Sequence, residues 1–184
     1  RVVGYNNIKS TPISLNKITN NEEDNQILLI ESFLCNSGFS EVINPPFTSK
    51  KSTDSIKIDN PLDINRKNFR TSLKDSLVDN LLYNARRQKD SIKLFEISDI
   101  YTKNIEIKQQ KKLGIIISGR LGNNYKEFSM NLDYNYLNKL LNGNLENECF
   151  KIIEILRSGL DTKKKEKIFY VEISLNDISS NPVT

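Results

Sequence analysis

The 184-residue sequence contains no histidine. Without an imidazole, the chain cannot build a nucleophile–histidine–carboxylate triad or a histidine-ligated metal site. It also lacks the commonest general base at neutral pH. Any catalysis in this chain would therefore depend on carboxylates, lysines, arginines or bound magnesium.

Long apolar runs are also absent, since no stretch approaches the ~20 residues of a membrane span. The start carries no secretory signal, and Met130 is the only methionine, so we expect a piece of a longer protein. Cys35 and Cys149 have no ligand-type neighbours at metal spacing, and we interpret both as reduced, buried thiols. We expect a cytoplasmic protein with no membrane contact.

The composition, with 37% hydrophobic and 27% charged residues, predicts one globular domain. The net charge of +4 is weak support for a nucleic-acid surface. The densest basic stretches are residues 111–112 and 163–167. We interpret both as solvated turns between strands, with a phosphate-binding patch as the alternative.

A first helix is predicted from Asn20, where capping residues precede Glu22 and Glu23, to a stop at Gly38. It is apolar on nearly all sides, which indicates burial on more than one face. Either the chain's own core or another subunit covers the second face. The residues that we predict for a subunit interface are Ile27, Leu28, Leu29, Ile30, Phe33 and Leu34.

A second helix is predicted from Ser72, because Leu73, Leu77, Leu81 and Ala85 recur at every fourth position. A third helix is expected over residues 132–141, and residues 102–112 are expected to form a polar turn. Strands are predicted at 41–44, 56–58, 92–97, 99–101, 113–118 and 168–175. This irregular order favours an α+β fold, a mostly antiparallel sheet with helices packed on it.

Motifs that carry chemistry are scarce. Residues 119–123 contain two glycines but lack the Lys-Ser/Thr of a P-loop, and a tight turn is expected there. The acidic pairs Asp59–Asp63 and Asp75–Asp79 fall at solvated positions. Arg70, just before the second helix, is a candidate anion or structural anchor. The residues alone therefore predict no recognisable active site and no metal site.

Three segments together resemble the beta chain of bacterial-type phenylalanyl-tRNA synthetases. Residues 3–8 look like its "GYdnI" stretch, residues 60–62 and 69–73 like its "NPl…mRtsL" segment, and residues 93–97 like its "rlFEi" strand. Weaker similarities lie at residues 38–43, 113–119 and 170–175. The similarities are collinear across almost the whole chain, which makes the combination specific.

The resemblance implies a class II synthetase-like fold in a catalytically inert core domain at residues 19–184. Residues 1–18 would then be the end of a preceding domain and a linker. It implies assembly with the alpha subunit, and with a second beta chain, in a heterotetramer whose central bundle uses the first helix. No cofactor is expected in this module. The holoenzyme would use ATP and magnesium, and tRNA would bind to the full-length enzyme.

The residues support an inert module, because Thr102 stands where an active class II site needs an arginine on the ATP α-phosphate. Residues 157–161 do not match the second ATP-binding arginine segment. Ser98 and Pro45-Pro46 also depart from the family pattern. The alternatives are a free-standing paralogue that binds an amino acid or nucleotide through Arg70 or Arg120, and direct tRNA contact through residues 103–112 or 163–167.

Overall fold

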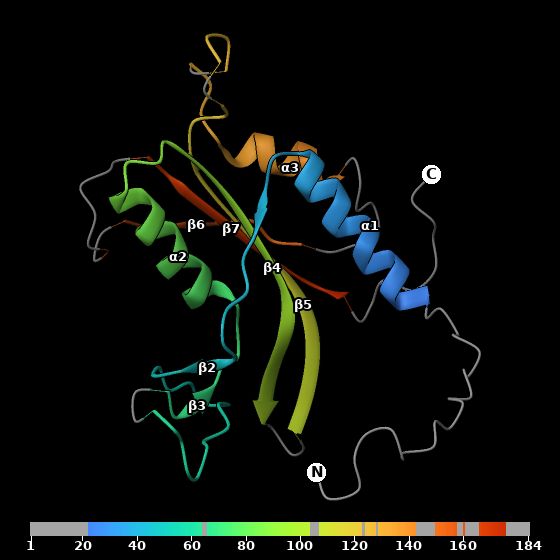
Figure 1. Ribbon diagram of the computed structural model, residues 1–184, viewed down its shortest axis with the longest axis vertical. Coiled ribbons are helices and arrows are strands. Elements are labelled where there is room, and N and C mark those ends of the chain that lie inside the picture. Colours follow the sequence, from blue (N-terminus) through green and yellow to red (C-terminus); the bar gives the residue numbers. More distant parts are fainter. Residues whose placement is uncertain are drawn as a thin grey trace, which may run out of the picture.

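The computed structural model describes residues 22–63, 66–103, 107–122, 124–127, 129–142, 150–157, 160 and 166–175. Its centre is a five-stranded sheet in the order β1-β4-β5-β7-β6 (Figure 1). The strands are β1 (Ser40–Glu41), β4 (Ser91–Lys103), β5 (Ile107–Gly119), β6 (Ile153–Ile155) and β7 (Ile168–Ser174). β1 runs parallel to β4, and the other neighbours are antiparallel. The predicted α+β fold with a mostly antiparallel sheet is confirmed.

Helices cover both faces of this sheet (Figure 1). α1 (Glu22–Asn36) and α3 (Tyr134–Asn142) pack on one face, and α2 (Lys74–Arg86) packs on the other. Side chains alternate between the two faces along each strand. Ile115 and Ile117 therefore join the core under α1 and α3, while Ile116 joins the core under α2.

Two glycines, one at the end of α1 and one inside β5, are required by the fold. Gly38 ends α1 with a φ of 81°, and Phe39 N donates to Leu34 O at 3.0 Å, as in a Schellman cap. Gly114 lets α2 approach β5, because a Cβ there would lie 2.8 Å from Leu77 Cδ1 and 3.1 Å from Leu73 Cβ. The stop at Gly38 follows the prediction, whereas the close approach at Gly114 depends on tertiary packing.

A small two-stranded sheet, β2 (Phe47–Thr48) with β3 (Asn68–Phe69), stands beside the central sheet below α2 (Figure 1). Residues 45–46, the two prolines, lead from β1 into β2. A proline cannot donate to a strand ladder, so the main sheet ends here and β1 is a short edge strand. We call the part of residues 47–69 that the structure describes the β2–β3 lobe.

Several expectations about local structure were wrong. Within residues 102–112, the described residues 102–103 and 107–112 are paired strand rather than turn, because the register of the long hairpin β4–β5 runs to Lys103 and Ile107. Residues 56–58 form no strand and make only a bridge from Lys57 to Asn68. β6 lies in a region where no strand was predicted. Cys35 is exposed rather than buried, while Cys149 and residues 1–18 fall outside the described part of the chain.

None of the helices in the described ranges has the length and apolar character that crossing a membrane requires.

Candidate functional site

The first buried polar cluster centres on Arg70, which precedes α2. Arg70 Nη1 donates to Glu96 Oε1 at 2.7 Å, and the side chains of this pair are only 4% and 2% exposed. Arg70 Nη2 donates to Ser98 Oγ at 2.5 Å, and Nε donates to the Asp99 carbonyl at 3.4 Å. Of the two roles predicted for Arg70, this geometry shows an internal ion pair with β4.

Glu96 extends the cluster to two further elements. Asn44 Nδ2 donates to Glu96 Oε2 at 2.8 Å, and Asn80 Nδ2 of α2 donates to Asn44 Oδ1 at 2.8 Å. Ser76 Oγ lies 3.5 Å from the same carboxylate oxygen. The cluster therefore ties the segment that follows β1 to β4 and α2.

The second polar cluster centres on Glu172 in β7. Its Oε2 accepts hydrogen bonds from Ser72 Oγ at 2.6 Å, from the Leu73 amide at 3.3 Å and from the Tyr170 hydroxyl. Its Oε1 accepts from Lys112 Nζ at 2.9 Å. A carboxylate from a distant strand thus holds the two residues that precede α2, near the helix N-terminus, where negative charge suits the helix dipole.

The protonation of this cluster follows from its hydrogen bonds. Burial by itself would raise the pKa of Glu172, but the bonds that it accepts from Ser72, Tyr170 and Lys112 hold that pKa below its usual range. Burial, together with the Glu172 carboxylate, raises the pKa of the Tyr170 hydroxyl. Glu172 is therefore an ionised structural acceptor rather than a group poised to take up a proton near neutral pH.

A cavity of about 700 Å³ lies between the β2–β3 lobe and the N-terminal half of α2. Phe47 and Phe69 line it on the lobe side, and Asp75 and Asp79 line it on the helix side. Lys50 Nζ reaches across to Asp75 Oδ1 at 2.7 Å. The other residues that line it are mostly polar: Asn44, Pro45, Thr48, Ser49, Lys51, Ser52, Ser55, Arg66, Arg70, Thr71, Ser72, Ser76 and Asn80.

The six apolar residues predicted for an interface do not share one environment. Leu34 and Ile30 are 0% and 7% exposed and belong to the chain's own core. Phe33 packs against that core, and Ile27 is half-buried. Leu28 and Leu29 are 57% and 55% exposed on the outer side of α1. The interface prediction is untested, but only Leu28 and Leu29 remain open for a partner.

The two candidate anion anchors lie at separate places along β4, Arg70 beside the middle of the strand and Arg120 near its first residue. Arg70 contacts the strand between Glu96 and Asp99, whereas Arg120 follows Gly119, which pairs with Ser91. Arg120 forms a bridge to Asn131 in the turn expected after the central strand. The structure therefore does not bring the two arginines together around one ligand.

Sequence analysis missed Glu96 and Glu172 as organising residues. Each is a charged residue inside an apolar strand segment, at residues 92–97 and 168–175. Charged side chains are almost never fully buried without a partner, so this pattern signals a buried ion pair or hydrogen-bonded carboxylate. It does not reveal the partner, because Ser72 and Glu172 are far apart in the sequence.

The family model described as "Phenylalanyl tRNA synthetase beta chain CLM domain" matches residues 8–163. The chain belongs to this family. It is 28% identical to the phenylalanine–tRNA ligase beta subunit of Buchnera aphidicola subsp. Acyrthosiphon pisum, over 98% of this chain and 25% of that protein. The beta subunit of Aquifex aeolicus is 29% identical, over 69% of this chain and 17% of that protein. The chain thus spans a quarter or less of these two relatives.

Among solved structures, Desulfitobacterium hafniense PylSc, a pyrrolysyl tRNA synthetase, superposes with a TM-score of 0.51. The match covers 81% of this chain and 66% of that chain at 16% identity. This similarity confirms the class II synthetase-like fold. The relatives are beta subunits, so the alternative of a free-standing paralogue is not favoured.

Ser98, a departure from the beta-chain pattern, and Thr102, which stands where an active class II site needs an arginine, can both be located in the fold. Ser98, where the beta-chain motif has glycine, supplies the hydroxyl that accepts a hydrogen bond from Arg70. Thr102 lies near the tip of the β4–β5 hairpin and pairs with Lys108. Within the described residues, no group of three or more histidine, cysteine, aspartate or glutamate side chains could hold a metal ion. The predicted inertness of this beta-chain module stays a prediction.

Proposed function

We propose that this chain is a structural module of a phenylalanine–tRNA ligase beta subunit. It assembles with the alpha subunit, which joins phenylalanine to tRNA. Membership of the beta-chain family supports this proposal. The single observation that carries it is the exposed pair Leu28 and Leu29 on a helix whose other side already packs on the core.

Adjacent exposed leucines on a helix are typical of a covered surface. Isolated apolar residues are normal on a monomer, but contiguous apolar area often marks a protein contact. The half-buried Ile27 precedes the leucine pair, and Phe33 follows it one turn later. A helix from the alpha subunit could therefore pack along α1 without disturbing the core residues Ile30 and Leu34.

The proposal includes a heterotetramer with a second beta chain and a cytoplasmic location, where charged tRNA is used. ATP and magnesium would be bound by the alpha subunit and would not be needed by this module. Contact with tRNA would be made by the full-length enzyme. These statements follow from the beta-chain family rather than from a site in this chain.

The test is assembly with the alpha subunit of the same organism, measured as mass by light scattering. The wild-type protein should form a mixed complex that is larger than either component. Leu29→Asp should prevent this complex, because a carboxylate would be buried without a partner. Its circular dichroism spectrum and melting temperature should stay close to wild type, since Leu29 is exposed in the unassembled fold.

A matched control is Leu156→Asp, which makes the same substitution at a leucine that is 72% exposed beyond β6, at the other edge of the sheet. This variant should assemble as the wild type does. If both variants assemble normally, α1 does not form the interface with the alpha subunit. If only Leu29→Asp fails while keeping its fold, the scaffold role is supported.

A further inference from the structure

The cavity between the β2–β3 lobe and α2 has the features of a nucleotide-binding pocket. We propose that it receives an unpaired nucleotide of a single-stranded RNA segment, with the base against Phe47 and the adjoining phosphates near Lys51 and Arg66. This inference goes beyond the proposed scaffold role and does not depend on it. Neither the family similarity nor the predicted interface assigns this pocket.

The first argument is an aromatic surface that is partly open and firmly supported. Phe47 lines the cavity and is 39% exposed. Its ring meets Phe69 edge-on, with centroids 5.1 Å apart, and Phe69 packs against Tyr101 at 4.8 Å. Unstacked RNA bases are commonly held on such aromatic side chains.

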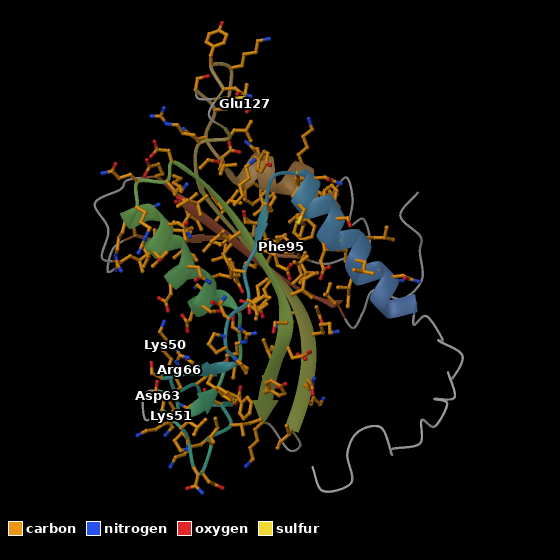
Figure 2. The ribbon with its side chains drawn as sticks, in the orientation of Figure 1. Lys50, Lys51, Asp63, Arg66, Phe95 and Glu127 are labelled. Carbon is orange, nitrogen blue, oxygen red and sulfur yellow. The ribbon has the colours of Figure 1, made fainter. Side chains whose placement is uncertain are left out.

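The second argument is the placement of positive charge. Lys50, Lys51 and Arg66 all line the cavity, and Figure 2 shows them on one flank of the lobe, below α2. Lys50 Nζ lies 2.7 Å from Asp75 Oδ1, and Arg66 Nε lies 3.8 Å from Asp63 Oδ2, with the side chains of the second pair about half exposed. Exposed pairs of this kind are weak, so a phosphate could compete for Arg66.

The third argument is that the remaining lining suits a base edge and a ribose. Hydroxyl and amide groups of Ser49, Thr71, Ser76 and Asn80 surround the cavity. These groups can both donate and accept hydrogen bonds. A cavity of about 700 Å³ accepts one splayed nucleotide, whereas the stacked pairs of a duplex would stay outside it.

The acidic residues fix the orientation of such a ligand. Asp75 and Asp79 lie on the α2 side of the cavity, and Lys50 is paired with the first of them. Phosphates would be repelled from that wall and would follow the lobe, where Lys51 and Arg66 lie. The base would then point inward between Phe47 and the helix.

The experiment measures binding of a fluorescein-labelled single-stranded ribohexamer and of a blunt duplex of the same length, by anisotropy. The experiment uses the full-length protein, assembled with its alpha subunit. The single strand should bind more tightly than the duplex. Phe47→Ala should weaken single-strand binding by roughly 5- to 150-fold, the factor expected for one stacked base.

The cationic part of the pocket has a separate readout. The double variant Lys51→Gln/Arg66→Gln should reduce the slope of log K against log salt by about 1.4, because two phosphate contacts are lost. Lys139→Gln/Lys151→Gln removes the same charge at exposed positions outside the cavity and should leave the slope unchanged. Phe47→Leu keeps an apolar side chain at this position of the lobe and controls for folding.

Equal binding of single strand and duplex would overturn the proposal. So would wild-type affinity in both Phe47 variants, or equal slopes for the two double variants. Light scattering of the same variants with the alpha subunit separates this result from the scaffold role. A variant that assembles normally but loses single-strand binding tests the pocket alone.

Discussion

Replacing Arg70 with methionine tests whether the buried pair with Glu96 holds together β4, α2 and the segment that follows β1. Methionine keeps much of the apolar stem but removes the guanidinium. Glu96 would then keep only Asn44 and Ser76 as partners while 1% exposed. Removing one member of a buried ion pair typically costs about 3–5 kcal/mol, because the other charge stays uncompensated.

For a protein of this size, each kcal/mol lowers the melting temperature by about 2–4 °C, so a decrease of roughly 6–20 °C is expected. Thermal and urea unfolding followed by circular dichroism measure this change. Arg66→Met is the matched control, since its side chain is 55% exposed and its nearest carboxylate oxygen is 3.8 Å away. That substitution should change the free energy of unfolding by less than about 1 kcal/mol.

The double variant Arg70→Met/Glu96→Gln completes the test. Because both charges are then absent, its loss of stability should be clearly smaller than the sum of the two single losses. Additive losses would show that the pair is not coupled. An Arg70→Met protein as stable as Arg66→Met would refute the reasoning altogether.

The other predictions concern Glu172, Gly114 and Gly119. The folded pKa of Glu172 is depressed, so its contribution is present above the unfolded value near 4.5 and is lost as pH falls through the folded value; urea unfolding from pH 6 to pH 3 should lose less stability in Glu172→Gln than in wild type. Gly114→Ala should lower the free energy of unfolding by about 1–3 kcal/mol, because the new methyl group overpacks against Leu77. When Leu77 is already alanine, adding Gly114→Ala should cost less than it does in the wild type, measured in the same assay. Gly119→Ala should lower the melting temperature, because its φ is 96° and a Cβ would lie 1.9 Å from the Asp90 carbonyl oxygen.

Local sequence patterns were sufficient to predict the helices and strands whose own residues show a clear periodicity or an end signal. The four-residue apolar repeat predicted α2, the glycine after the apolar run predicted the end of α1, and the β-branched run at 113–118 predicted the central strand. The outer part of the β4–β5 hairpin, residues 102–103 and 107–112, was missed because its polar residues resemble a turn. This part of the two strands extends beyond the main core, where its side chains are exposed or half-buried. It therefore shows little of the alternation of apolar and polar residues that predicts a strand.

Arg70 was singled out as an anchor, but the choice between a ligand and an ion pair required the fold. The cavity was missed entirely, since its walls come from the β2–β3 lobe and α2, and its lining residues look like ordinary turn and cap residues. Phe47 follows two prolines and gives no local sign that its ring remains partly exposed.

The sequence by itself determined the family, the α+β class, the helices and the lack of any imidazole chemistry, because these depend on composition, local periodicity and short collinear motifs. Only the tertiary structure decided which side of α1 stays open, which partners Glu96 and Glu172 find, and where a polar cavity forms. Those features arise from contacts between residues distant in the chain. A charged residue within an apolar strand predicts that a partner exists, but the sequence does not show which residue that partner is.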